Sequence, residues 1–129
     1  MRPRTLRLTV IPSRLAVCRL EPEAAELETA VGSKFHSITR TGEEVSVVCD
    51  ESAVPAGARA EKGWRALKVR GPIPFAETGV LASLALPLAD AEIGIFVIST
   101  YDTDYLLVKG ADLDRAVAAL AAAGHEVEM

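Results

Sequence analysis

The stretch GIFVISTYDTDYLLVKGADLDRAVAALAAAGHEV, residues 94–127, carries the strongest fold signal in the chain. Its first part predicts two strands, Gly94–Thr100 and Tyr105–Lys109, because continuous apolar runs of this length are typical of strands in the centre of a sheet. A helix should follow, with Asp112 at its N-cap and Gly124 just beyond its end. One face of that helix carries the apolar residues expected to meet the core: Leu113, Ala116, Val117 and Leu120.

The residues around this stretch complete a regular order of strands and helices. Trp64–Arg70 predicts a strand, and Pro74–Leu88 predicts a helix that Pro87 terminates. Glu126–Met129 has room for one short edge strand. Residues 64–129 therefore predict the order β-α-β-β-α-β, the ferredoxin-like arrangement in which helices cross one face of an antiparallel sheet.

The start of the chain shows shorter versions of the same patterns. Alternating apolar residues in Leu6–Val10 and Leu15–Leu20 flank a break at Pro12 and predict a hairpin. The good helix formers of Glu21–Val31 predict a short helix that stops at Gly32.

A second hairpin and a linker are predicted before residue 64. Phe35–Arg40 and Val45–Cys49 alternate around a tight Thr-Gly turn. Asp50–Gly63 is rich in small residues and loop formers, which favours a linker. We therefore expect an α+β protein of two βαββαβ-type units with antiparallel sheets and helices on one face, at residues 1–60 and 61–129, the first of them shortened or divergent.

An internal repeat supports two related units. An offset of 60 residues places ITRTGEEVSVV (Ile38–Val48) over ISTYDTDYLLV (Ile98–Val108), with strand, acidic turn and apolar strand in the same order. Upstream, an offset of 50 places LAVCRLEP over RALKVRGP. The two matches in sequence indicate a duplicated βαββ-type unit.

Composition restricts the possible classes of protein. The chain has 129 residues, of which 50% are apolar and 25% charged, and this balance excludes a disordered chain or a coiled coil. A formal net charge of −4 without a Lys/Arg cluster argues against a nucleic-acid partner. The apolar runs are far shorter than the roughly 20 residues of a membrane span, and no signal-peptide core is present, so a cytoplasmic protein is expected.

Reactive and metal-binding residues form no recognised pattern. Cys18 and Cys49 lie in apolar runs and are expected to be buried, reduced thiols, with a disulfide between strands as the open alternative. His36 and His125 lack the spacing of metal ligands, so neither a metal nor a cofactor is expected. The chain contains no GxSxG, P-loop, GxGxxG or HExxH motif, which argues against an enzyme.

Two polar segments of the second half form the candidate ligand site. Gly71–Gly79 leads into a helix, and the unpaired N–H groups at a helix start attract a carboxylate. Thr100–Asp104 offers two acids and two hydroxyls in five residues. A free amino acid carries both charges and needs both features, although a rigid proline turn and a solvated turn are the structural alternatives. The candidate residues are Glu77, Thr78, Gly79, Thr100, Tyr101, Asp102 and Asp104.

The two halves differ at this site. Asp104 is expected to pair with the ammonium or a cationic side chain of a bound amino acid, and amides near Gly79 with its carboxylate. The first half instead has Glu43 and Glu44 in its turn and acidic residues, beginning with Glu21, at its helix start, and these would repel a carboxylate. One site per chain is therefore expected.

Residues 94–127, preceded by WRALKVRGPIPFAETGVLASLALPLADA (64–91), resemble the ACT domain, specifically the tandem-ACT proteins related to the cytosolic arginine sensors called CASTOR. FHSITRTGEEVSVVCDESAVP (35–55) is similar to the divergent first ACT unit of the same small bacterial proteins. The resemblance implies a βαββαβ fold, ACT units packed side by side, and regulatory amino-acid binding at the interface between units without catalysis.

The resemblance also implies particular ligand contacts. Thr100, Tyr101 and Asp104 match the ligand-lining turn of the sensors, and Glu77 lies in the matching strand-to-helix loop. The loop departs from the glycine-rich form common among ACT domains, because prolines occupy positions 72 and 74.

The leading functional hypothesis is a small, non-catalytic regulatory module that binds a free amino acid and forms a homodimer. An unknown regulated protein could be a further partner. The alternative is a structural or protein-interaction module with no small-molecule ligand, and an enzyme of the ferredoxin-like type has the least support.

Overall fold

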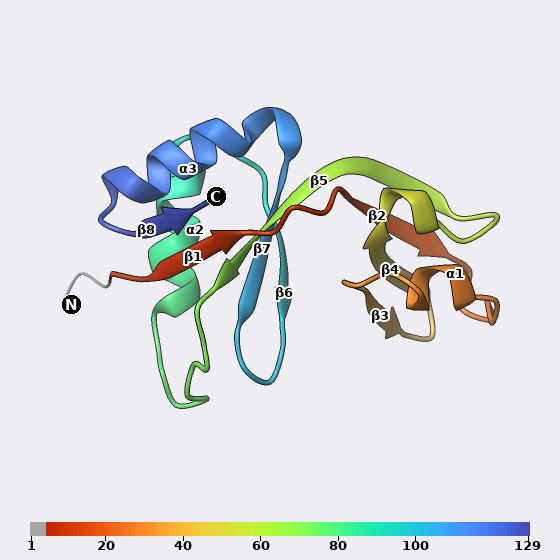
Figure 1. Ribbon diagram of the computed structural model, residues 1–129. Helices are drawn as coiled ribbons and strands as arrows, with labels where there is room; N and C mark the ends of the chain where they lie inside the picture. The colour runs from red at the N-terminus through yellow and green to blue at the C-terminus, as the bar shows by residue number, and fades with distance from the viewer. Residues whose placement is uncertain (1–4) are drawn as a thin grey trace. The chain divides into compact units, whose positions relative to one another are not determined.

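The computed structural model describes residues 5–129, which form two compact units (Figure 1). The smaller unit is Ser13–Trp64, and the larger unit combines residues 5–12 with Arg65–Met129. This division differs from the predicted boundaries of 1–60 and 61–129, because the first strand of the chain belongs with the second half.

The larger unit has the predicted order of strands and helices. Its sheet runs β6-β7-β5-β1-β8, and from β5 onward the elements follow the order β-α-β-β-α-β, which confirms the α+β prediction. β6 is an edge strand among the described residues and not the central strand predicted from its apolar sequence. The elements are β1 (Arg7–Val10), the end of β5 (Arg59–Val69), α2 (Val80–Asp90), β6 (Phe96–Ser99), β7 (Asp104–Lys109), the 3₁₀ turn η2 (Gly110–Asp112), α3 (Leu113–Ala122) and β8 (Glu126–Glu128).

The predicted first hairpin is wrong, because β1 pairs with distant strands. Leu8 lies opposite Val69 of β5 in an antiparallel ladder and opposite Val127 of β8 in a parallel one. β1 is thus inserted between β5 and β8 and contributes Leu8 and Val10 to the core of the larger unit. Alternation identified the strand, but alternation does not encode which partner a strand takes.

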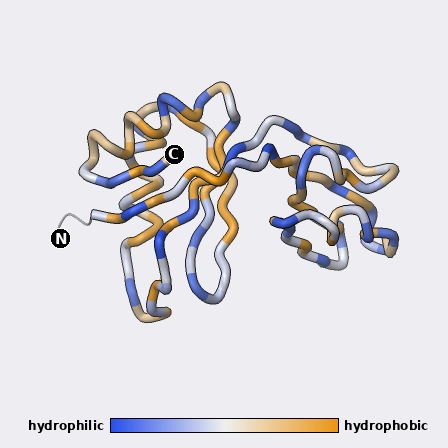
Figure 2. The backbone as a smooth tube through the Cα atoms, viewed as in Figure 1, coloured by the Kyte–Doolittle hydropathy of each residue, from blue (hydrophilic) through white to orange (hydrophobic). Residues whose placement is uncertain are grey.

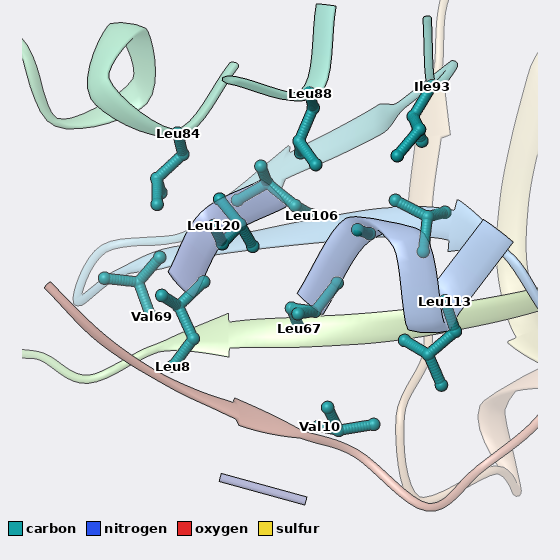
Figure 3. Packing of buried hydrophobic residues seen from close by; sticks show 12 residues of the cluster. Leu8, Val10, Leu67, Val69, Leu84, Leu88, Ile93, Leu106, Leu113 and Leu120 are labelled. Carbon is teal, nitrogen blue, oxygen red and sulfur yellow. The ribbon is translucent and has the colours of Figure 1, made fainter. Parts of the chain in front are cut away.

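Both helices of the larger unit cover the same core. Figure 3 shows Leu84 and Leu88 of α2 above strand residues such as Leu106 and Val69, with Leu120 of α3 packed among them. Burial of these side chains, each worth about 1.5–3 kcal/mol, holds the helices on one face of the sheet. α3 ends as predicted, with a glycine of positive φ after its C-cap.

Helix α2 differs from its prediction at both ends. It begins at Val80 and not at Pro74, because Gly79 adopts a left-handed conformation with φ of +80°. It continues through Pro87 to Asp90, so the proline does not terminate it. Pro87 has no N–H for the carbonyl four residues earlier, which belongs to Ser83.

His125 supplies a hydrogen-bond partner for the Ser83 carbonyl. Its Nε2 lies 3.0 Å from the Ser83 carbonyl oxygen, and its Nδ1 accepts from the Leu6 N–H at 3.1 Å. A backbone N–H can only donate and a carbonyl can only accept, so the ring is the neutral Nε2–H tautomer. The imidazole, 4% exposed, therefore joins α2 to the segment that leads into β1.

Replacement of His125 by phenylalanine should lower the free energy of unfolding by about 2–4 kcal/mol, because two backbone groups lose their partner. In a Pro87→Ala background position 87 regains an N–H for Ser83, so the cost of His125→Phe should shrink. Denaturant unfolding of the four proteins measures this cycle. An equal cost in both backgrounds would contradict the link between His125 and Pro87.

The smaller unit has a similar strand order, with less helix. Its strands run β3-β4-β2-β5, and the β3–β4 hairpin confirms the predicted second hairpin. A 3₁₀ turn stands where the larger unit has α3. The elements are β2 (Leu15–Leu20), α1 (Glu28–Val31), β3 (Ser37–Arg40), β4 (Val45–Asp50), η1 (Glu51–Ala53) and residues 59–64 of β5.

The predicted helix over Glu21–Val31 is reduced to its last four residues. The guanidinium of Arg40 explains the difference, because it donates to the carbonyls of Pro22 and Ala24, the latter at 2.6 Å. In a helix these carbonyls would accept from backbone N–H groups four residues later. A side chain from β3 therefore satisfies carbonyls that the predicted helix would have used.

The predicted linker is also wrong. Residues 59–63 belong to β5, and the Glu51 carboxylate accepts from the Gly63 N–H at 2.7 Å. This contact closes the Asp50–Gly63 segment on itself within the smaller unit. The small residues of this segment predicted a linker, but Ala53, Val54 and Ala58 pack against the core of the smaller unit.

Cys18 and Cys49 are free thiols in the core of the smaller unit, which agrees with the expected buried, reduced thiols and not with the alternative disulfide. They lie on neighbouring strands, β2 and β4, and the Cys49 thiol is hydrogen-bonded to Cys18. Burial raises the pKa of Cys49 to about 12 and also raises the pKa of Cys18. Both thiols are therefore protonated at neutral pH.

These raised pKa values predict a loss of stability at alkaline pH. A thiol of the unfolded chain has a pKa near 9.0, whereas the pKa of Cys49 in the folded protein is about 12. The stabilising effect of the buried thiol is therefore complete below pH 9 and is lost between pH 9 and 12. The free energy of unfolding should fall by up to about 1.4 kcal/mol per pH unit there. Cys49→Ala should flatten this slope in denaturant titrations, and an unchanged slope would contradict the assignment.

Candidate functional site

The loop from β5 to α2 and the β6–β7 turn lie at the same end of the larger unit (Figure 1). Figure 2 shows that the turn is hydrophilic, whereas the strands that lead into it are largely hydrophobic. The Ile73 N–H donates to the Asp102 carbonyl at 2.6 Å. The Thr103 hydroxyl, in a side chain 5% exposed, donates to the Val69 carbonyl at 2.6 Å. Two hydrogen bonds thus connect the end of β5 and the start of the loop that follows it to the β6–β7 turn.

Gly71 allows the close approach. A Cβ at this position would lie 2.9 Å from the carbonyl oxygen of Asp102 and 3.1 Å from the Cβ of Thr103. The first distance is shorter than carbon–oxygen contacts in packed proteins, and backbone cannot yield as a side chain can. Any larger residue would therefore push the loop away from the turn.

The turn itself uses its threonines structurally. Thr100 Oγ1 accepts from the Thr103 N–H at 3.2 Å, and the Thr100 N–H donates to the Thr103 carbonyl at 2.8 Å. In the smaller unit Thr41 makes the same two contacts with Glu44, at 3.2 Å and 2.9 Å. The hydroxyl of Thr100, predicted as a ligand contact, is therefore engaged in holding the turn.

A cavity of about 340 Å³ lies between the loop and the turn. Six of the seven predicted site residues line it, namely Glu77, Gly79, Thr100, Tyr101, Asp102 and Asp104, while Thr78 is exposed and is not in the lining. The sequence analysis missed seven further lining residues, namely Ile73, Pro74, Phe75, Val80, Leu81, Ser99 and Thr103. Ile73, Pro74, Phe75 and Thr103 lie within the two predicted segments and the other three lie directly beside them, so their position in the sequence is the signal that could have identified them.

The charged side chains of the cavity are all acidic. Glu77, Asp102 and Asp104 line it, and the described lining includes no Lys, Arg or His. The Ser99 hydroxyl donates to Asp104 Oδ1 at 2.6 Å and so holds that carboxylate in place. Asp102 and Asp104 come from one turn, and carboxylates that line a cavity favour a cation there.

The opposite wall is the start of α2. Gly79 is its N-cap, no side chain caps it, and its first turn carries no acidic residue. The Ser83 N–H makes the first helical bond, to the Gly79 carbonyl at 3.0 Å. The N–H groups of residues 80–82 precede that bond and have no carbonyl partner in the helix, which favours an anion at this wall.

The arrangement can bind a zwitterion, with a carboxylate at the helix start and an ammonium at the acidic turn. Residues 5–129 contain no group of three His, Cys, Asp or Glu side chains placed to hold a metal ion. No helix in this part of the chain is long and apolar enough to cross a membrane.

Comparisons with known proteins agree with this fold. The ACT-domain family model matches residues 59–122, and a second model, described as an N-terminal domain, matches residues 13–57. The human putative protein CASTOR3P is 31% identical over 122 residues, which cover 83% of this chain and 75% of the relative. The chain belongs to the ACT-domain family.

Within that family the chain is similar to the CASTOR proteins. The cytosolic arginine sensor for mTORC1 subunit 1 of Bos taurus is 32% identical over 99 residues, which cover 68% of this chain. The chain spans only 30% of the length of that sensor. The similarity therefore concerns less than a third of the sensor.

Solved structures show the same architecture. Protein Atu0741 from Agrobacterium tumefaciens has 40% identity and a TM-score of 0.89, and the match covers 96% of this chain and 92% of that one. The regulatory subunit of aspartate kinase from Thermus thermophilus has a TM-score of 0.64 over 95% of this chain and 99% of its own. At 9% identity the second likeness concerns the fold alone.

Replacement of Thr103 by valine should lower the free energy of unfolding by about 1–3 kcal/mol, because the buried Val69 carbonyl loses its donor. The exposed Thr39→Val in β3 is the matched control and should change stability by less than about 0.5 kcal/mol. Denaturant unfolding compares the two variants. Equal effects would show that the Thr103 hydroxyl does not hold the turn.

Proposed function

We propose that the larger unit binds a free amino acid in the cavity between the β5–α2 loop and the β6–β7 turn, in a regulatory and non-catalytic role. The observation that carries the proposal is one cavity with an uncapped helix start on one side and carboxylates on the other. Membership of the ACT-domain family and similarity to proteins named arginine sensors support it.

The charge of the cavity favours a ligand with a cationic side chain. A neutral amino acid brings one ammonium to Asp102 and Asp104 of the turn, whereas arginine or lysine brings a second cation. An acidic amino acid would add a repulsive charge, and like charges at close range are costly. We therefore expect affinity to rise from acidic through neutral to cationic amino acids.

The smaller unit is not expected to bind a ligand of this kind. Its α1 has four residues, against eleven in α2. Its turn carries Glu43 and Glu44, and α1 is too short for its N-terminus to bind the carboxylate of a ligand. One site per chain, in a cytoplasmic homodimer that acts on a partner protein, is the form that we propose.

Isothermal calorimetry with charge-matched pairs tests the proposal. Arginine should bind more tightly than citrulline, and lysine more tightly than norleucine, because each pair differs chiefly in one positive charge. Glutamate should bind least. Absence of heat with all five would support the alternative, a structural or protein-interaction module without a small ligand.

Asp104→Asn should weaken arginine binding by about 2–5 kcal/mol, because it removes one partner of a charge pair. The equivalent turn position in the smaller unit gives the control, and Glu44→Gln should leave affinity unchanged. Calorimetry measures both variants, with thermal unfolding to confirm that each is folded. Equal losses would indicate a site shared by both turns, and unaltered binding in Asp104→Asn would exclude this turn.

A further inference from the structure

Two aromatic rings meet at the cavity, one from each wall. Phe75 comes from the β5–α2 loop and Tyr101 from the β6–β7 turn, and both line the cavity. Their ring centroids are 4.8 Å apart with an interplanar angle of 78°, an edge-to-face contact. The contact thus connects the loop to the turn through residues other than those that make the hydrogen bonds between them.

Burial does not explain the contact. Phe75 is 75% exposed and Tyr101 is 79% exposed, so neither ring belongs to the core clusters. Two large aromatic side chains left in water are unusual for a position with only a packing role. Their mutual contact is therefore the feature to be explained.

The hydrogen bonds between the two walls involve Ile73 and Thr103 and not the residues that carry the rings. Both hydrogen bonds are 2.6 Å long, and Gly71 leaves no free space there. Beyond Ile73, residues 74–79 are all exposed, and Glu77 N–H donates to the Pro74 carbonyl within the loop itself. The aromatic contact is thus placed to hold an exposed segment against a fixed turn.

We propose that Phe75 and Tyr101 form a clasp that opens to admit the amino acid and closes over it. This inference rests on the proposed function and adds the control of access to it. An edge-to-face pair of this kind favours contact over separation by roughly two- to twelvefold, which is strong enough to bias closure and weak enough to open readily.

A clasp has a kinetic signature that a ligand contact lacks. If the rings only gate the cavity, removal of one ring should speed L-arginine association and dissociation together, by roughly two- to twelvefold, with less than a twofold change in Kd. A ring that contacts the ligand directly would instead speed dissociation alone and weaken Kd. Stopped-flow binding measures both rates.

The variants are Phe75→Ala, Tyr101→Ala and the double variant. The double variant should match either single one, because each removes the same contact. Leu86→Ala is the control and should retain wild-type rates, because it removes an exposed apolar side chain of α2 outside the cavity lining. Additive effects in the double variant, or a change in dissociation alone, would overturn the clasp.

A measurement without ligand separates this proposal from the proposed function. In the free protein, nuclear Overhauser contacts between the Phe75 and Tyr101 ring protons should be present, and their absence overturns the clasp whether or not arginine binds. Failure of wild-type protein to bind any amino acid overturns the proposed function, and with it the role of the clasp. Wild-type binding with unchanged rates in all variants overturns the clasp alone.

Discussion

The hydrogen bonds of His125 connect parts of the larger unit that the chain brings together only on folding. Leu6 is 119 residues away in sequence and Ser83 is 42 away, and one imidazole satisfies a backbone group of each. The ring hydrogen-bonds the Ser83 carbonyl, which Pro87 leaves without a backbone donor inside α2. It also holds Leu6, in the segment that leads into β1. The position of α2, whose first turn forms a wall of the cavity, follows from this junction and from the packing of Leu84 and Leu88.

A second set of contacts shapes the cavity. The contacts among Val69, Gly71, Ile73, Asp102 and Thr103 bring a strand end, a loop and a turn together. None of these contacts uses a carboxylate of the cavity. The scaffold of the site is therefore separate from the charged groups proposed to bind the ligand, and substitutions can test the two roles separately.

The two units have similar strand orders and similar turns, but they differ next to the turn where the larger unit has its cavity. Both have a turn held by a threonine, Thr41 in one and Thr100 in the other, with nearly the same hydrogen-bond lengths. They differ in the helix that faces the turn. Arg40 binds carbonyls before α1 and leaves that helix four residues long, whereas α2 extends for eleven.

Local sequence patterns were sufficient to predict the features that depend on interactions between residues close together in the chain. Asp112 was predicted as the N-cap of α3 and occupies that position, although its carboxylate pairs with Arg115 at 3.0 Å and does not cap the helix. Gly124 ends α3 with a φ of +96°. The acidic residues of the turn and the loop that faces them were likewise evident, because composition changes sharply at Thr100–Asp104.

The sequence by itself determined the order of elements in residues 64–129 and most of the polar residues of the cavity, because periodicity and turn chemistry depend on neighbours a few positions away. Tertiary structure decided the partners of β1, the length of α1 and the passage of α2 through Pro87. It also decided that Phe75 meets Tyr101. Each of these outcomes depends on a contact between residues far apart in the chain, and such a contact leaves no trace in the pattern of either segment alone.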